Sequence, residues 1–399
     1  MKYLILVGDG MGDFPLPELD GRTPLEAAKT PAMDELARRG NLSLLKTIPP
    51  GFPPGSDVAN LSLLGYQPEE CYTGRAPLEA ASMGVSLAAD EVAFRCNLVT
   101  LDRSAEHAPT MVDYSAGHIT TEEASQLIAA LDQALGSSSG RFYPGVSYRH
   151  LYVHRGECPG LETVPPHDHI GRDVGTYWRN YQVEPGLMAL MEKAGEVLAD
   201  HPVNQTRRQT GQLPANAIWL WGEGKTPSMA TIGERYQISG ALISAVDLLK
   251  GIGVCAGMEI INVPGATGYI DTNYQGKAEG ALAAAARKDL VFVHVEAPDE
   301  ASHQGSLAHK IKAIEDFDQK IVRPILDGLK DEPHRVALAM DHFTPLALRT
   351  HADRPVPVVI FDSRQAGTGA GGYNEKNAAA VGTVFENGKL FFETLLEKT

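Results

Sequence analysis

The chain has 399 residues, of which 43% are hydrophobic and 21% are charged, and its formal net charge is −15 at pH 7. This is the composition of an ordinary globular α/β protein with two or three domains. The acidic balance argues against nucleic acid or an anionic membrane as partner, so an anionic substrate must be bound by a local cluster of cations or by metal ions.

No stretch approaches the roughly 18 unbroken apolar residues of a membrane span, and the apolar start is too short for a secretory signal. We therefore expect a cytoplasmic protein without a membrane partner. The four cysteines show no CxxC spacing, which favours neither a zinc knuckle nor a disulfide framework. The sequence leaves the oligomeric state open.

The first predicted elements surround two polar residues. An apolar run at residues 3–7 predicts a buried strand, and the turn that follows it contains Asp9. A helix is predicted from Thr30 to Gly40, with proline at its first position. A loop rich in proline and glycine then leads to Ser56, which precedes an apolar helical run at residues 58–64.

Ser56 has two interpretations. A serine at the start of a helix is often only a cap that satisfies a backbone N–H. It is also well placed as a nucleophile, because a helix N-terminus and a neighbouring divalent metal both favour the ionised hydroxyl, and the same N–H groups hold a phosphoryl group. The metal ligands predicted elsewhere in the chain favour the nucleophile.

The character of the sequence changes near residue 82. Strands are predicted at residues 92–100 and 148–153, a helix with a capping box at 121–135, a long polar loop at 154–182 and a helix at 185–199. We interpret residues 82–228 as a smaller α/β domain inserted into a first domain formed by residues 1–81 and 229–399.

The first domain then resumes with alternating elements. We expect an apolar helix at residues 240–249, a strand at 258–263, an alanine-rich helix at 276–287 and a regular amphipathic helix at 310–329. These elements predict a mostly parallel sheet flanked by helices.

Three apolar strands each end in a carboxylate. Asp9 follows residues 3–7, Asp299 follows residues 291–295, and Asp341 follows residues 336–340. In an open α/β sheet the carboxyl ends of the strands form the ligand crevice, so these side chains are expected to converge there. Together with the nearby imidazoles they suit two divalent transition metals; the predicted ligands are Asp9, Asp299, His303, Asp341, His342 and His351. A single Asp–His pair spaced by four residues is also typical of an ordinary solvated helix start. The metal-site prediction therefore depends on finding a carboxylate at the end of three different strands.

These motifs resemble those of the alkaline phosphatase superfamily, and more narrowly of the cofactor-independent phosphoglycerate mutases of archaeal type. The resemblance covers nearly the whole chain. It is carried by GDGMGD with Asp9, PGSDVANLSLLGY with Ser56, VEAPDEASH with Asp299 and His303, MDH with Asp341 and His342, and THADRPVP with His351.

The resemblance implies a phosphatase-like domain and a second domain that contributes substrate-binding residues. It implies two ions such as Mn²⁺, Zn²⁺ or Co²⁺, a phosphoserine formed on Ser56, a small phosphorylated substrate and no 2,3-bisphosphoglycerate. Carried over by position, one ion is held by Asp9, Ser56, Asp341 and His342, and the other by Asp299, His303 and His351.

Some positions depart from the archaeal pattern. The chain reads AGH at residues 116–118 and WGEG at 221–224, where the archaeal mutases carry arginines. These positions look more like a bacterial branch proposed to act as homoserine kinases. The expected activity is interconversion of 3- and 2-phosphoglycerate, with phosphorylation of homoserine in threonine biosynthesis as one alternative and a catalytically silent phosphate-binding protein as another. The candidate substrate-binding residues are Arg75, His118, His167, Asp168, Arg172 and Lys250.

Overall fold

The computed structural model describes residues 1–103, 109–365, 367, 369 and 371–397. It divides the chain into two compact units, one formed by Met1–Tyr72 with Ser228–Thr399 and the other by Thr73–Pro227. The second unit begins earlier than the residue 82 expected from the sequence. The reason is helix α5 (Arg75–Ser82), whose Ala76 and Ala80 are buried against Ala93 and other residues of the second unit's own sheet.

The described part of the first unit contains an eight-stranded sheet. Strand β12 is antiparallel to both of its neighbours, and the other strands all run in the opposite direction to it. The expected mostly parallel sheet is therefore confirmed. In spatial order the strands are β13 (Val384–Phe385), β2 (Asn41–Leu45), β12 (Val356–Asp362), β11 (His334–Ala339), β1 (Lys2–Gly8), β10 (Leu290–Val295), β8 (Gly240–Ile243) and β9 (Glu259–Ile260).

The three strands that precede the carboxylates lie side by side at the centre of this sheet. Strand β1 is parallel to β10 on one side and to β11 on the other, with Leu6 opposite Val293 and Leu338. All three strands are almost entirely buried, as expected for apolar runs in a parallel sheet covered on both faces. Their carboxyl ends consequently meet at one edge of the sheet.

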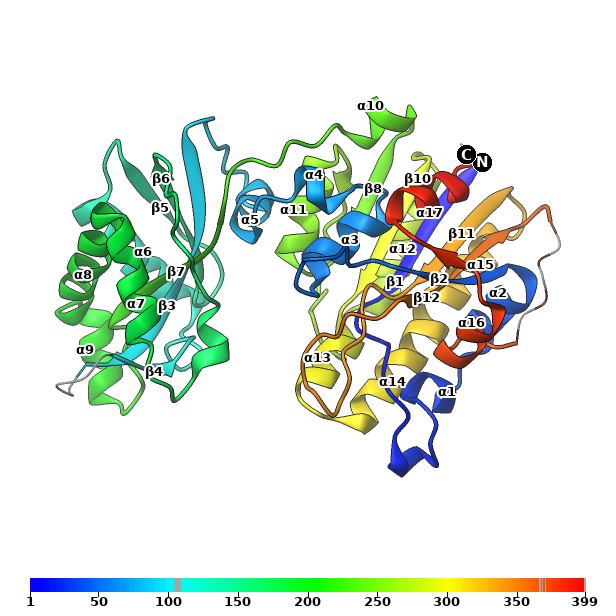
Figure 1. The fold of residues 1–399 in the computed structure, drawn as a ribbon, viewed down its shortest axis with the longest axis horizontal. Helices are drawn as coiled ribbons and strands as arrows, with labels where there is room; N and C mark the ends of the chain where they lie inside the picture. The colour runs from blue at the N-terminus through cyan, green and yellow to red at the C-terminus, as the bar shows by residue number, and fades with distance from the viewer. Residues whose placement is uncertain (104–108, 366, 368, 370, 398–399) are drawn as a thin grey trace. The chain divides into compact units, whose positions relative to one another are not determined.

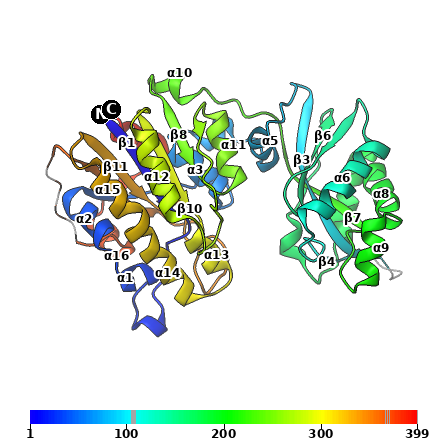
Figure 2. The same cartoon turned by 180° about the vertical axis from the view of Figure 1, so that it is seen from behind.

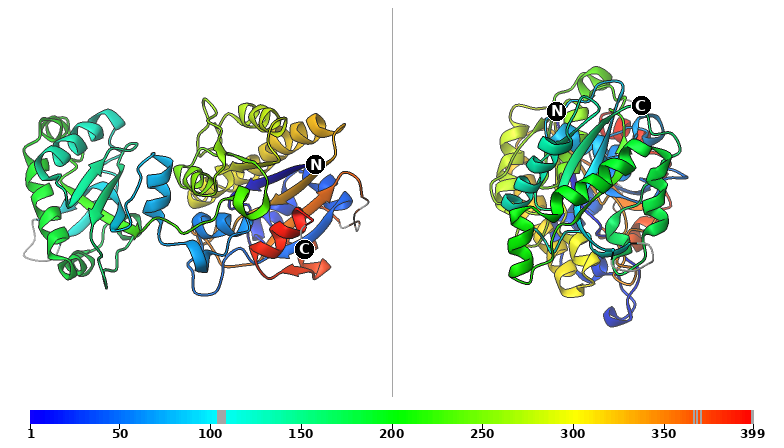
Figure 3. Two further views of the ribbon diagram at one scale, coloured as in Figure 1. Left: turned by 90° about the horizontal axis from the view of Figure 1, so that it is seen from above. Right: turned by 90° about the vertical axis from the view of Figure 1, so that its left-hand side faces the viewer.

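Helices cover both faces of the first unit's sheet. Figure 2 shows α12 (Tyr274–Ala285), α14 (Leu307–Phe317) and α15 (Arg323–Leu329) in front of the strands, and Figure 1 shows α3 (Ser56–Leu63) and α17 (Gly388–Leu395) on the opposite face. The same layering is visible from above in Figure 3. Helix α3 packs against α17 and against α11 (Asp247–Cys255).

The remaining described helices of this unit are short, apart from α2 (Pro31–Arg39), which begins and ends as predicted. They are α1 (Pro24–Ala27), α4 (Pro68–Cys71), α10 (Ile232–Tyr236), α13 (Ala297–His303) and α16 (Glu375–Val381). No helix in the described part of either unit is both long and apolar enough to span a bilayer.

Three predicted elements differ from the structure. The apolar helix expected at 240–249 is wrong: residues 240–243 form β8, which pairs with β10, and α11 starts only at Asp247. The strand expected at 258–263 is reduced to β9. The helix expected at 310–329 is interrupted between α14 and α15 by a π-helical turn, Asp318–Val322. Pro324 follows this turn, and because proline lacks an N–H, a regular helical hydrogen bond cannot form there.

The second unit contains an antiparallel sheet built around one long strand, β3 (Glu91–Asp102). Strand β3 pairs with β7 (Ala217–Gly224) along one edge and with β6 (Arg149–Arg155) and β4 (Thr110–Asp113) along the other, and β5 (Gly140–Tyr143) pairs with β6. Alternate β3 residues such as Phe94 and Leu98 lie in the main core of the unit. Helices α6 (Thr121–Leu135) and α8 (Pro185–Ala199) contribute to this core, and α7 (Gly175–Asn180) and α9 (Pro202–Gln209) complete the unit.

Candidate metal centre and active site

Three carboxylates converge where the central strands end. Asp9 follows β1, Asp341 follows β11, and Asp299 lies in the first turn of α13 just after β10. All three are at least 95% buried. The backbone N–H of Gly10 donates a hydrogen bond to Asp341 Oδ1 (3.1 Å), which ties the loops after β1 and β11 together.

Histidines complete two sets of possible ligands. On α13, Asp299 and His303 lie one turn apart with Oδ2 and Nε2 separated by 3.1 Å, and His303 Nε2 is also 3.1 Å from His351 Nε2. On the other side, His342 Nε2 lies 3.5 Å from Asp9 Oδ1 and 3.6 Å from Asp341 Oδ2. The structure thus brings together all six carboxylate and imidazole residues that the sequence singled out.

Ser56 lies beside the second set. It is the first residue of α3, and its Oγ is 3.1 Å from His342 Nε2. The residue at the N-cap position is Gly55, so the interpretation of Ser56 as the helix cap does not apply. Asn60, one turn further along α3, donates from its side-chain amide both to the backbone oxygen of Ser56 (2.8 Å) and to Asp341 Oδ2 (2.9 Å). This bridge fixes the start of α3 relative to the carboxylates.

The carboxylates are close enough to perturb one another. Burial raises the pKa of Asp9 well above its usual range, and the charges of Asp341 and Asp299 raise it further. Burial also opposes ionisation of Asp299, but hydrogen bonds from His303 and His351 outweigh it and hold the pKa of Asp299 well below its usual range. The cluster therefore concentrates negative charge in a region with little water.

Three buried atoms in and beside this cluster have no hydrogen-bond partner among the described residues, namely Asp9 Oδ1, His294 Nε2 and Asn60 Oδ1. Unpaired buried acceptors beside several carboxylates are what a bound cation would satisfy. A mixed oxygen and imidazole donor set suits Mn²⁺, Zn²⁺ or Co²⁺. The residues present therefore fit divalent metal ions.

The comparisons with known proteins agree with this geometry. A profile of the 2,3-bisphosphoglycerate-independent phosphoglycerate mutases matches residues 37–204. The chain is 52% identical over 406 aligned positions to a Geobacter sulfurreducens protein named "Probable 2,3-bisphosphoglycerate-independent phosphoglycerate mutase", with both proteins covered completely. It is 55% identical over 365 positions to the mutase of that name from Methanosarcina acetivorans, with 90% of each covered. The chain belongs to this family.

Solved structures support the fold of this mutase family member. A protein from Pyrococcus horikoshii superposes with a TM-score of 0.83 at 30% identity, covering 100% of this chain and 98% of that one. The cofactor-independent phosphoglycerate mutase from Thermoplasma acidophilum superposes with a TM-score of 0.66 at 28% identity, covering 100% and 99%. The family recognised from the sequence motifs is thus confirmed.

The candidate substrate-binding residues of this mutase homologue are distributed over both units. Asp168 and Arg172 are exposed in the second unit, whereas Lys250 lies on α11 of the first unit and pairs with Asp247 (3.3 Å). His167 lies edge-on to the rings of Tyr114 and Trp221, with centroids 6.0 and 5.6 Å away. The remaining two candidates are His118 and Arg75. His118 and the preceding Gly117 both have a left-handed backbone conformation, and Arg75 is the first residue of α5.

Sequence reasoning missed a cationic cluster in the second unit. Arg95 lies in the middle of β3, with its guanidinium 4.2 Å from the centroid of the Trp221 ring and its Nε 3.0 Å from Glu79 Oε2. Burial lowers the pKa of Arg95 to about 10; Glu79 opposes this shift, and the positive charges of Arg75 and Arg149 add to it. An arginine inside a strand that is otherwise largely apolar was the signal in the sequence.

In the first unit, sequence reasoning missed His294, Asn60 and Lys310. Lys310 is completely buried, and its Nζ donates to Asp13 Oδ2 (2.8 Å) and to the backbone oxygens of Gly12 (3.1 Å) and Thr344 (2.9 Å). It therefore joins the two loops that carry Asp9 and Asp341. Its place in the apolar stripe of an amphipathic helix was the available signal.

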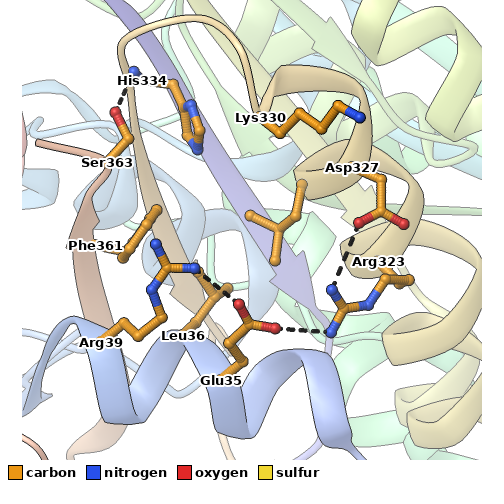
Figure 4. Close-up of a pocket in the computed structure, with 10 residues that line it drawn as sticks. Glu35, Leu36, Arg39, Arg323, Asp327, Lys330, His334, Phe361 and Ser363 are labelled. Carbon is orange, nitrogen blue, oxygen red and sulfur yellow. Dashed lines mark hydrogen bonds and ion pairs between the residues drawn. The ribbon is translucent and has the colours of Figure 1, made fainter.

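A cavity of about 180 Å³ in the first unit is separate from this site (Figure 4). It lies near His334, the first residue of β11, whereas Asp341 comes two residues after the last residue of that strand. Its carboxylate Glu35 is paired with Arg39 (2.8 Å) and Arg323 (3.0 Å). The cavity is therefore at the end of the sheet opposite to the metal ligands.

Proposed function

We propose that this protein interconverts 3-phosphoglycerate and 2-phosphoglycerate through a phosphoserine on Ser56, without 2,3-bisphosphoglycerate. The observation that carries the proposal is the position of Ser56 Oγ, 3.1 Å from His342 Nε2 at the start of α3, beside the converging carboxylates. The choice of substrate is based on relatives that match over nearly their whole length and are named as phosphoglycerate mutases.

Two ions would be held by the clustered side chains. One set is Asp9, Ser56, Asp341 and His342, and the other is Asp299, His303 and His351. When bound, Mn²⁺, Zn²⁺ or Co²⁺ would favour the ionised serine hydroxyl and neutralise charge on the phosphoryl oxygens.

The transfer takes place in two balanced steps. Ser56 Oγ bonds to phosphorus as the bond from phosphorus to the 3-oxygen of glycerate breaks, and the proton lost by Ser56 is balanced by one gained at the 3-oxygen. The 2-oxygen of glycerate then bonds to phosphorus as the bond from phosphorus to Ser56 Oγ breaks, and the proton lost by the 2-hydroxyl is balanced by one regained at Ser56 Oγ. The positive end of the helix dipole at the start of α3 favours a phosphoryl group at this position, although the N–H of Val58 in the first turn already donates to Asp57 Oδ1 (2.9 Å).

The second unit is proposed to bind the phosphate and carboxylate of the substrate. Support comes from the positive charge around Arg95. The charges of Arg75 and Arg149 both act on Arg95, and Glu79 is the acidic partner of Arg95. His118, His167, Asp168 and Arg172 of this unit, and Lys250 of the first unit, stay candidates for the same role. We also propose a cytoplasmic location, in keeping with a small phosphorylated metabolite as substrate.

Phosphorylation of homoserine is the competing activity, suggested by His118 and Trp221 at positions where archaeal mutases carry arginine. The contacts of Trp221 weaken this alternative. Its indole N–H donates to Asn97 Oδ1 (3.0 Å) and its ring stacks on Arg95, so Trp221 holds an arginine in place.

The test is a direct comparison of activities. Metal-loaded enzyme is given 3-phosphoglycerate in an enolase-coupled assay and, in parallel, homoserine with ATP, both followed by phosphorus NMR. Formation of 2-phosphoglycerate at about 1–10³ s⁻¹ is expected. If phosphohomoserine is the only product, the protein is a homoserine kinase and the proposed substrate is wrong. Binding of substrate without any turnover would indicate a catalytically silent binding protein.

A further inference from the structure

His294 lies beside Asp9 and Asp341 although no sequence motif marked it. It is the penultimate residue of β10, lies opposite Val7 of β1, and is completely buried. Its Nε2 lies 3.1 Å from Asp9 Oδ2 and 4.0 Å from Asp341 Oδ2. A buried imidazole among apolar strands is costly unless its nitrogens have partners.

The Nε2 atom has no hydrogen-bond partner among the described residues, despite its short distance to Asp9. The ring edge is therefore not aligned for an N–H donated to that carboxylate. The other oxygen of that carboxylate, Asp9 Oδ1, also lacks a hydrogen-bond partner among the described residues. A cation bound by both Asp9 and His294 would provide each residue with the missing partner.

His294 also shares its orientation with the three histidines of the sequence motifs. In each, Nε2 faces the carboxylates and Nδ1 faces an oxygen, which is the usual arrangement of metal-ligating histidines because the second nitrogen fixes the ring. The oxygens are Ser244 Oγ for His294 (3.5 Å), Arg349 O for His303 (2.9 Å), Thr344 Oγ1 for His342 (3.2 Å) and Pro54 O for His351 (3.2 Å).

We propose that His294 Nε2 is a direct ligand of the ion held by Asp9 and Asp341. The inference rests on the proposed metal dependence and adds a ligand to it. Donor atoms that each lie about 2.0–2.2 Å from one ion are roughly 3–4 Å from each other. The distances from His294 Nε2 to Asp9 and Asp341 fall in that range.

This ligand makes the two ion sites unequal. The site of Asp9, Asp341, His342 and His294 is buried, with imidazole side chains that are 0% exposed. At the other site the side chains of His303 and His351 are 33% and 23% exposed. The buried ion has more ligands and less access to water, so it dissociates more slowly.

The solution test compares Zn²⁺ and Mn²⁺ binding, by competition with a chromophoric chelator, in the unaltered protein, His294→Gln and His150→Gln. His150 is a matched control because it is a buried strand histidine of the second unit. The unaltered protein and His150→Gln are expected to bind two ions. His294→Gln should lower the metal affinity of one site by more than about 100-fold and leave the affinity of the other unchanged. Substituting a residue that only supports a ligand typically lowers metal affinity by about 10–100-fold, so a larger loss indicates a direct ligand.

A crystal structure of the unaltered protein loaded with Zn²⁺ gives the second readout, which decides the matter even if His294→Gln does not fold. His294 Nε2 is expected about 2.0–2.1 Å from an ion. An Nε2 that instead donates a hydrogen bond to Asp9, or a loss of about 100-fold or less in His294→Gln, overturns the assignment while leaving the proposed function intact. An unaltered protein that binds no ion overturns both.

Discussion

Ser56 differs from the other residues of the site because its role is chemical and its structural contribution is small. Replacing it with alanine should reduce turnover by at least about 10³-fold, since the group that accepts the phosphoryl is removed. The free energy of unfolding should change by less than about 1 kcal/mol, because the N-cap of α3 is Gly55 and no capping bond is lost. Steady-state kinetics and thermal unfolding measure the two effects.

Ser62→Ala is the matched control for Ser56→Ala. It makes the same substitution on the same helix, away from the carboxylates, and should keep turnover near that of the unaltered protein. Comparable activity in Ser56→Ala and Ser62→Ala would show that Ser56 is not the phosphoryl acceptor.

The raised pKa of His303 leads us to predict that metal binding depends on pH. Burial lowers the pKa of this imidazole, but its hydrogen bond with Asp299 and the charge of that carboxylate outweigh burial and raise the pKa to about 9 in the metal-free protein. A ligating imidazole must be neutral, so at pH 7 an incoming ion has to displace the proton. Apparent affinity should therefore rise with pH up to about 9.

Calorimetry of metal binding at pH 7 in two buffers with different ionisation enthalpies measures this proton directly. We expect the binding enthalpy to differ between the buffers by the amount that proton release predicts. Identical enthalpies, with affinity constant between pH 6 and 9, would contradict a protonated His303 in the metal-free site.

The sequence was informative about candidate site residues that follow strands, and it was uninformative about those that lie within strands. Asp9, Asp299 and Asp341 were predictable because each ends an apolar run. His294 and Arg95 lie inside buried strands, where a polar residue is indistinguishable from a satisfied core residue until its neighbours are known.

Helix α3 depends on close packing against α17. A Cβ placed on Gly388, the first residue of α17, would lie 1.9 Å from the backbone oxygen of Ser62 on α3. Gly388→Ala should therefore force the helices apart and lower the free energy of unfolding by about 1–3 kcal/mol. Because α3 carries Ser56, turnover should fall as well.

Gly233→Ala on α10 provides the contrast for Gly388→Ala. The atoms nearest to its added methyl are 3.8 and 3.9 Å away, which is ordinary contact. Alanine should be neutral or stabilise by up to about 1 kcal/mol, because it lowers the entropy lost on folding. Chemical denaturation of both variants measures the difference, and equal stability of the two would argue against tight contact between α3 and α17.

Elements with local signals were predicted well. Helix α6 ends before Gly136 and begins with the Thr120–Glu123 capping box, as the sequence indicated. Strand β8 was missed because a short apolar run fits a buried strand and a helix equally well, and pairing with β10 decides between them. The π-helical turn between α14 and α15 could not be predicted, because the apolar residues keep their helical spacing through it.

The second unit has the features of an independently folding domain. Its sheet and helices enclose a core of their own, and all three possible metal-ligand groups found among the described residues lie in the first unit. A fragment of residues 73–227 should therefore unfold cooperatively and bind no divalent ion tightly. Circular dichroism with a metal titration tests this, and a fragment without a cooperative transition would contradict it.

The two-unit organisation was visible in the sequence as a change of character, but its boundary was not. The helix at Arg75–Ser82 reads as a continuation of the first unit along the chain. Its contacts with β3 and β7 assign it to the second. Such contacts between elements far apart along the chain are not encoded in local periodicity.

The most direct test of the account is to trap the covalent intermediate. Metal-loaded protein is mixed with 3-phosphoglycerate, quenched in acid within milliseconds, digested and analysed by mass spectrometry, with Ser56→Ala treated in parallel. The account predicts a phosphorylated peptide that contains Ser56 and is absent from the variant. Phosphate on a peptide without Ser56, or turnover retained in Ser56→Ala, would contradict it.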